Sequence, residues 1–297
     1  MIEVYLRDLS AEMGRRGVRG RVRRRILAEV TDHLHCDETA VERFGAPPEI
    51  AAHFADQLGS AATVRSVRWG FAALAVAGVA CAMGMTQFWL PGVWGGGAQG
   101  QVAGSAPATV VAFLVAIMAA QVSLVAGGLG LLRTIRRRRT PVLPSAEVAI
   151  IRRRMAVALV SGLVCMSGLA YLLASIHGVE RVLSVPESGE VLLVAAGAAA
   201  IVLAAAWIPV MRASRIRVEA AGTAGDVFDD LGRVVPSPLR GHPWVFAGGV
   251  AALLGIVVLA AGIVVSDGYD GALRAMAEVA ACLAGFALLG RYLGLRR

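Results

Sequence analysis

The sequence contains no lysine and no asparagine, and only 17% of its 297 residues are charged. All 29 basic residues are therefore arginine, and they outnumber the 21 acidic residues. The four cysteines are too few for the disulfide frameworks of small secreted proteins. Hydrophobic residues make up 57% of the chain, whereas soluble domains average about 45–50% apolar and about 25% charged residues. This composition excludes an ordinary soluble protein, a disordered chain and a typical nucleic-acid module.

Long apolar runs account for this composition. A helix that crosses a bilayer needs about 20 mainly apolar residues. Five segments satisfy this requirement, and a sixth is marginal because Arg274 and Glu278 lie in its first half. The six predicted spans are residues 69–90, 107–132, 155–176, 191–211, 244–265 and about 272–290. We therefore predict an all-α fold, with a small cytoplasmic helical domain over residues 1–64 and a six-helix transmembrane domain over residues 65–297.

The distribution of arginine predicts the orientation of these spans, because arginine-rich short loops stay in the cytoplasm. The segments 1–68, 133–154, 212–243 and 291–297 hold 27 of the 29 arginines, and the other three loops hold only Arg181 and Arg274. We expect a multi-pass protein of the cytoplasmic (inner) membrane with both termini in the cytoplasm. Arg136–Arg139 and Arg152–Arg154 are interpreted as residues that fix this topology and attract anionic lipid headgroups. Direct nucleic-acid binding is not expected, because interleaved aromatic residues or a recognition helix are missing.

The first 68 residues differ from the rest because their apolar residues recur at helical spacing. The three periodic sets are Ile2, Tyr5, Leu6, Leu9 and Met13; Val22, Ile26, Val30, His33 and Leu34; and Ile50, Ala51, Phe54, Ala55 and Leu58. Pro47-Pro48-Glu49 is a helix start, because proline in the first turn loses no needed donor and the carboxylate favours the positive end of the helix dipole. We predict a compact domain of three or four helices.

Three motifs in this segment carry a resemblance to a known family. They are Tyr5-Leu6 with Leu9, Glu29-Val30-Thr31-Asp32-His33-Leu34, and Phe44-Gly45-Ala46-Pro47. Over about residues 2–64 the chain resembles the HAAS domain, a permease-prefix-like cytoplasmic helical module of bacterial multi-span membrane proteins. The resemblance implies a core position for His33 and a role in signalling or transport regulation. Proteins of that family are often partnered with PadR-like transcriptional regulators, and a related prefix module precedes permeases of ABC systems.

Two charged segments are candidates for docking. The run Arg15–Arg25 includes Arg15, Arg16, Arg19 and Arg23, and a predicted cytoplasmic loop carries Asp226-Val227-Phe228-Asp229-Asp230-Leu231-Gly232. The plain interpretation of the acidic segment is a short amphipathic helix that is capped by Asp226 and ended by Gly232. The functional interpretation is that Asp226, Phe228, Asp229 and Asp230 dock on the arginines of the N-terminal domain. A cation site is a third interpretation.

Few residues inside the predicted spans are candidates for function. Glu278 either forms an ion pair with Arg274 at the membrane edge or serves as a functional group at depth. The pattern Gly78-x-x-Cys81-x-x-Gly84 recurs as Gly162-x-x-Cys165-x-x-Gly168. Stripes of small residues allow helix backbones to approach closely. We interpret both cysteines as packing residues, with redox or metal chemistry as the alternative.

We predict no catalytic, cofactor or metal site. His33, Cys36 and Asp37 share a helix face, but a structural zinc site usually needs four ligands and no second cluster completes one. The favoured function is a non-enzymatic regulatory membrane protein whose cytoplasmic domain binds a partner such as a PadR-like regulator. The alternative is a transporter or ABC-type permease subunit, which would need polar groups or broken helices near the membrane midplane. An intramembrane enzyme would need a nucleophile and base, or metal ligands, at depth.

Overall fold

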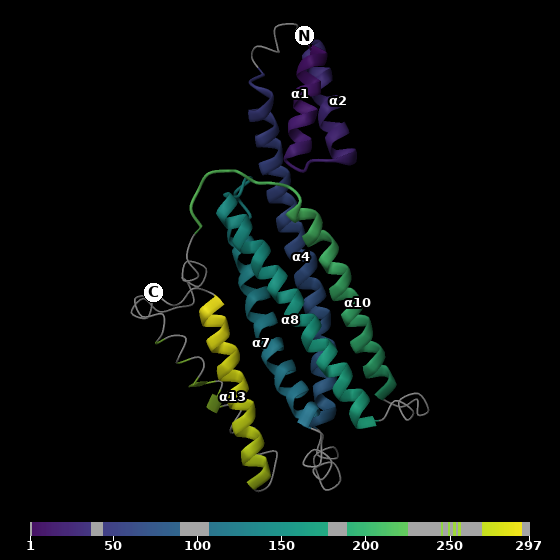
Figure 1. The fold of residues 1–297 in the computed structure, drawn as a ribbon, viewed down its shortest axis with the longest axis vertical. Helices are drawn as coiled ribbons and strands as arrows, with labels where there is room; N and C mark the ends of the chain where they lie inside the picture. The colour runs from purple at the N-terminus through teal and green to yellow at the C-terminus, as the bar shows by residue number, and fades with distance from the viewer. Residues whose placement is uncertain are drawn as a thin grey trace.

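Helices are the only regular secondary structure in the part of the chain that the computed structural model describes. This part comprises residues 2–36, 44–89, 107–177, 189–224 and 269–292, with isolated positions between 245 and 256. The helices described with their bounds are α1 (Ile2–Arg15), α2 (Gly20–Cys36), α4 (Pro47–Trp89), α7 (Pro107–Arg136), α8 (Ser145–His177), α10 (Gly189–Ser214) and α13 (Tyr269–Tyr292). The predicted all-α class is confirmed over these residues. Figure 1 shows α1 and α2 beside one end of the long α4, and the other helices around its second half.

The helices α1 and α2 pack with the first turns of α4 in a small assembly, here called the N-terminal helical unit (residues 2–58). Its core contains the side chains Tyr5, Leu9, Met13, Val18, Ile26, Val30, Leu34, Ala51 and Ala55. The hydroxyl of Tyr5 donates a hydrogen bond to the carbonyl of Gly45 at 3.1 Å, and its ring packs edge-on against Phe44. The buried faces predicted for α1 and for the start of α4 therefore meet in one core.

The face predicted for α2 is wrong at two of its five positions. Ile26, Val30 and Leu34 are buried, but Val22 is 47% exposed and His33 is also exposed. Residues four apart drift by about 40° around a helix with 3.6 residues per turn, so Val22 lies about 120° away from Leu34. The contact between α1 and α2 is small, and a narrow contact stripe does not reach that far. The core role that the resemblance implied for His33 is corrected for the same reason.

The helix α4 joins the N-terminal helical unit to the helix bundle without a break. It runs for 43 residues, from Pro47 to Trp89, which corresponds to about 65 Å. No proline follows Pro48 in this stretch and no glycine lies between Gly59 and Gly70, so nothing in the sequence ends the helix there. The predicted domain boundary between residues 64 and 65 consequently falls inside a helix.

Four helices are long and apolar enough to cross a membrane. The apolar segments are Pro47–Cys81, Val111–Arg136, Ser145–Ala174 and Leu193–Ser214, which belong to α4, α7, α8 and α10. The predicted span 244–265 lies almost entirely outside the described residues. The span predicted at 272–290 falls within α13, whose apolar stretch Val279–Tyr292 is shorter. In the bundle α7 packs mainly on α8, α10 packs on α4 and α8, and α13 packs on α7 (Figure 1).

Most of the described arginines outside the N-terminal helical unit gather at the end of the bundle that faces this unit. The end of α7, the start of α8 and the end of α10 all lie there (Figure 1). The guanidinium of Arg153 lies 4.7 Å from the ring centre of Tyr292, which brings the last turn of α13 to the same end. We call this region the arginine-rich end.

Candidate functional site

An extended segment after α10 connects the N-terminal helical unit to the bundle. This segment, residues 215–224, is here called the strap. The backbone N–H of Arg217 donates a hydrogen bond to the carbonyl of Arg16 at 3.0 Å. The carboxylate of Glu219 accepts one from the Arg16 guanidinium at 2.7 Å, and its backbone N–H donates to Asp56 Oδ1 at 2.7 Å. The strap therefore contacts both the end of α1 and the start of α4.

The other side of the strap is attached to the bundle. The N–H of Ser145, at the start of α8, donates to the carbonyl of Ala220 at 2.9 Å. The first N–H groups of a helix have no partner within the helix, so the strap satisfies one of them. Arg152 donates from Nε to Thr63 Oγ1 at 3.0 Å and from Nη1 to the carbonyl of Ile216 at 3.2 Å. One arginine of α8 thus holds α4 and the strap together.

Two glycines allow the strap to lie directly against the N-terminal helical unit. Gly17 has a φ of +84°, and a Cβ added to it would lie 1.9 Å from the carbonyl oxygen of Arg215. A Cβ added to Gly59 would lie 2.3 Å from a methyl group of Val218. Both positions require the absence of a side chain, because backbone or packed side chain occupies the space.

A buried ion pair lies beneath the strap. Glu147, in the first turn of α8, is fully buried, and Arg133 of α7 is 2% exposed. Their side chains form two hydrogen bonds of 2.5 and 2.9 Å, and Arg137 adds a third to Glu147 at 3.2 Å. Between α7 and α8, the N–H of Leu143 donates to Ser60 Oγ of α4 at 2.9 Å. Polar contacts therefore connect α4, α7 and α8 at the arginine-rich end.

The charges at the end of α1 are also coupled. Hydrogen bonds from Arg15 and then Arg16 lower the pKa of Glu12, although desolvation opposes them. Burial alone lowers the pKa of Arg16, but the hydrogen bonds and charges of Glu219 and Glu12 outweigh it and raise the pKa. Arg16 therefore remains a cation between a carboxylate of its own helix and a carboxylate of the strap.

The structure assigns different positions to the four arginines that were predicted to dock. Arg16 contacts the strap, and Arg15 pairs with Glu12 while remaining exposed. Arg19 is exposed, and Arg23 is half-buried with its Nη1 beside Gly14. The predicted partners Asp226, Phe228, Asp229 and Asp230 lie outside the described residues. The carboxylate that meets Arg16 is Glu219, seven residues before Asp226.

The two predicted small-residue stripes contact each other at their central cysteines, but Gly78 is exposed and an added Cβ there would have nothing within 4 Å. The sulfur atoms of Cys81 and Cys165 are 3.9 Å apart, so equivalent positions of the repeat face each other across α4 and α8. Gly168 packs against α7, because an added Cβ would lie 3.0 Å from that of Ala116. The residues Cys81, Cys165, Gly78 and Gly162 also line an apolar cavity of about 440 Å³ between α4, α7 and α8. The surroundings of Gly84 and the side chains of Arg274 and Glu278 lie outside the described part of the structure.

No group of three His, Cys, Asp or Glu side chains that could hold a metal ion occurs within the described residues. No family model, curated protein or solved structure matches this chain. The interpretation of the site therefore rests on the contacts within this chain alone.

The sequence analysis missed the strap and the buried ion pair. Glu147 is the only acidic residue among residues 133–154, which contain eight arginines. A lone carboxylate in such a segment is a usable signal for a buried ion pair. The strap has no comparable signal, because it binds largely through its backbone.

Proposed function

We propose that this chain is a non-enzymatic regulatory protein of the bacterial inner membrane, with six spans and both termini in the cytoplasm. In this proposal the arginine-rich end faces the cytoplasm, in agreement with the positive-inside rule. The N-terminal helical unit binds a cytoplasmic protein partner such as a PadR-like transcriptional regulator. The observation that carries the proposal is the continuity of α4, which belongs to the core of both parts.

The buried residues of α4 explain why this continuity matters. Ala51 and Ala55 are fully buried in the N-terminal helical unit, while Ala73 and Ala77 are 4% and 5% exposed in the bundle. A helix that is packed at both ends transmits a shift or rotation from one end to the other. The strap adds a second connection between the unit and the bundle, and its contacts would differ between two arrangements of the bundle. A difference of a few kcal/mol between such arrangements is enough for a switch.

The outer surface of α1 offers a place for the partner. Val4 is 50% exposed, and Glu3, Arg7 and Asp8 around it are exposed as well. The proposal places the partner on this face of α1, where an apolar side chain and charged side chains are accessible together. Neither α4 nor the strap has a described contact with this side of α1, so a partner could bind without disturbing the junction.

Copurification from the native host tests the proposal. The tagged full chain is compared with a chain that lacks residues 1–46, which retains α4, and with the variant Val4→Glu. Gln57→Glu is the matched control, because Gln57 is exposed on α4 in the same unit. We expect the partner to be lost from the first two variants and retained in the control. Recovery of the same partners without residues 1–46 would overturn the proposal, and an ATP-hydrolysing subunit among them would favour the permease alternative.

A further inference from the structure

We propose that the exposed arginines around the turn between α1 and α2 bind the phosphate groups of anionic lipids. These side chains, here called the turn arginines, are Arg15, Arg19, Arg21, Arg24 and Arg25. The N-terminal helical unit then rests on the membrane surface beside the bundle. The inference requires that the bundle spans a membrane, but it does not depend on a protein partner of the unit.

The turn arginines form a local concentration of positive charge at one end of the unit, although residues 2–58 together hold nine arginines and ten carboxylates. Seven arginines and no acidic residue occur between residues 15 and 25. Among these seven arginines, Arg16 binds Glu219 of the strap. Arg25 pairs with Glu29, but its side chain remains 82% exposed. Arg19, Arg21 and Arg24 form no ion pair with any described residue and are exposed.

Three contacts place the turn close to the expected membrane surface. Gly17 lies against the carbonyl of Arg215, directly after the end of α10. Ile216 accepts a hydrogen bond from Arg152, which stands three residues before the apolar run of α8. Arg152 also contacts Thr63, and Trp69 follows six residues later on α4 with 63% of its surface exposed. Exposed tryptophan is typical of the membrane–water interface.

These contacts give an approximate height for the turn. Ile216 and Val218 of the strap lie against Gly59, and Arg152 bridges from Ile216 to Thr63. Six to ten residues of helix correspond to about 9–15 Å, so the strap lies about that far above Trp69. The headgroup layer extends about 5–8 Å beyond the hydrocarbon on each side, and charges interact over about 8–10 Å at physiological salt. The turn arginines consequently lie within electrostatic range of lipid phosphates.

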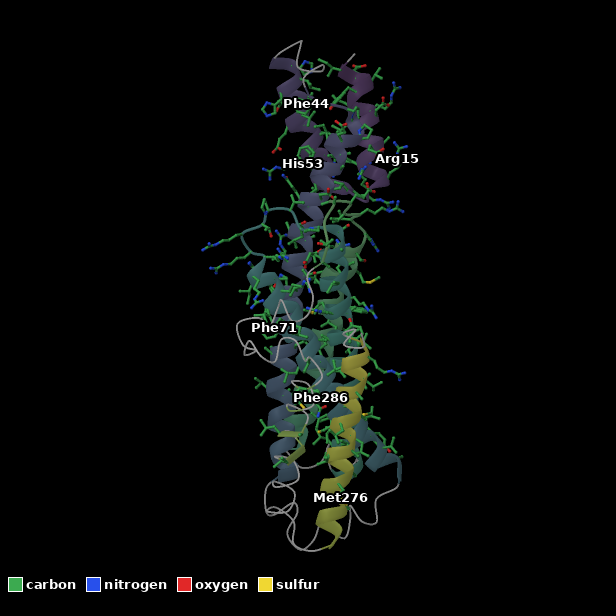
Figure 2. All side chains as sticks on the ribbon, turned by 90° about the vertical axis from the view of Figure 1, so that its left-hand side faces the viewer. Arg15, Phe44, His53, Phe71, Met276 and Phe286 are labelled. Carbon is green, nitrogen blue, oxygen red and sulfur yellow. The ribbon has the colours of Figure 1, made fainter. Side chains whose placement is uncertain are left out.

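The orientation of the unit agrees with this placement. Figure 1 shows α1 and α2 to one side of α4, with the turn between them at the end nearer the bundle. Figure 2 shows Arg15 at this lower end of α1, on the opposite end from Phe44. The turn therefore lies at the end of the unit that faces the bundle, and its long arginine side chains can reach toward a lipid surface beside the bundle.

Hydrogen exchange of the full chain in lipid nanodiscs tests the proposal. Discs of phosphatidylcholine alone are compared with discs that also contain phosphatidylglycerol. We expect amides of residues 17–25 to exchange several-fold more slowly in the anionic discs, because the first N–H groups of α2 lack helix partners and are shielded by bound headgroups. High salt should remove the difference, since it screens surface charges.

Two triple variants make the test specific. R19Q/R21Q/R24Q should abolish the difference between the two kinds of disc. R136Q/R138Q/R139Q removes the same number of exposed arginines at the arginine-rich end and should leave the difference intact. Unchanged exchange of the Leu9 and Met13 amides confirms that the unit remains folded in each variant.

Two results would overturn the proposal. One is equal exchange of residues 17–25 in both kinds of disc. The other is protection in phosphatidylcholine alone that is lost in D226N/D229N/D230N, which would assign the turn arginines to the chain's own acidic segment. Both readouts are independent of partner capture, so they separate this proposal from the proposed function.

Discussion

The N-terminal helical unit and the helix bundle are packed by different means. The core of the unit uses large side chains such as Leu9, Met13 and Leu34, which are fully buried. In the bundle, α4 and α10 contribute mainly alanine to the core, and α8 supplies large residues such as Met155 and Leu159. Burial of large apolar groups is favourable where water is the alternative solvent, whereas helices in a bilayer associate through close backbone approach. The larger share of alanine in α4 and α10 agrees with a bundle whose helices are long and apolar enough to cross a membrane.

The helix α4 contacts both cores through one stripe of small residues. Ala51, Ala55, Gly59, Thr63, Ser66, Gly70, Ala73 and Ala77 follow one another at helical spacing and are all buried. The large side chains of α1 cover the first part of this stripe, the strap covers the middle, and α8 and α10 cover the rest. The middle of α4 and the strap therefore form the junction of the two parts, and the variants below perturb the unit, the bundle or the contact between them.

The largest effect should come from removing the buried carboxylate of the bundle. Glu147→Ala removes the carboxylate with which the buried Arg133 pairs, and breaking a buried ion pair in this way costs about 3–5 kcal/mol. We expect a large loss of thermal stability of the full chain in detergent. Glu219→Ala is the control, because Glu219 is 57% exposed and exposed pairs contribute about 0–1 kcal/mol. Equal melting temperatures for the two variants would show that Glu147 is solvated.

A smaller effect should separate the unit from the bundle. Gly17→Ala places a Cβ where the carbonyl of Arg215 lies and also strains a backbone with positive φ, which costs about 1–3 kcal/mol. We expect faster hydrogen exchange of the Arg217 amide, whose acceptor is Arg16.

The chain provides a matched control for this variant. Gly20 also has a positive φ, of +66°, but nothing lies within 4 Å of an added Cβ. Gly20→Ala therefore imposes the strain without the clash. The assignment of the strap contact fails if both variants accelerate the Arg217 amide equally.

Periodicity and length predicted those parts of the fold that depend on side chains. Tyr5, Leu9 and Met13 recur at helical spacing and are buried together. Of the six spans that the apolar runs predicted, four coincide with helices that are long and apolar enough to cross a membrane. The continuity of α4 was not predicted, because Arg65 and Arg68 separate its polar and apolar halves. Those arginines change the hydropathy of the helix without breaking its backbone, since both have high helix propensity.

The candidate site could be predicted only in part. Arg16 was a predicted docking residue and does bind a carboxylate, but its partner Glu219 was not predicted. Arg217 donates through its backbone N–H and Ala220 accepts through its carbonyl. Every residue provides a carbonyl, and every residue except proline provides an N–H group. An extended segment of this kind has neither apolar periodicity nor a motif, so its position depends on the tertiary structure.

A third prediction concerns only the unit and the strap. The pKa of Glu12 is lowered below its usual value of 4.5 by Arg15 and Arg16. A carboxyl with a lowered pKa in the folded state stabilises that state above its unfolded pKa, and this contribution is lost as the pH falls through the folded pKa. The stability difference between the wild type and Glu12→Gln should thus be constant above about pH 4.5 and shrink below it. Acid titrations of both proteins by circular dichroism measure it, and a difference that grows at lower pH would contradict the assignment.

The smallest perturbation tests the register of the bundle without destabilising it. The Cys81 and Cys165 sulfur atoms are 3.9 Å apart, whereas Cys282 contacts Gln121 of α7. A short bifunctional alkylating reagent should therefore bridge Cys81 and Cys165 within one chain, and mass spectrometry should detect the bridged peptides. Cys81→Ala and Cys165→Ala should each abolish the product, while Cys282→Ala should leave it.

Successive residues are separated by about 100° around a helix, so an error of one residue in the register of α4 against α8 would move the thiols apart. A bridge that forms only between two chains, or one that survives Cys165→Ala, would mean that the small-residue stripes do not meet as described.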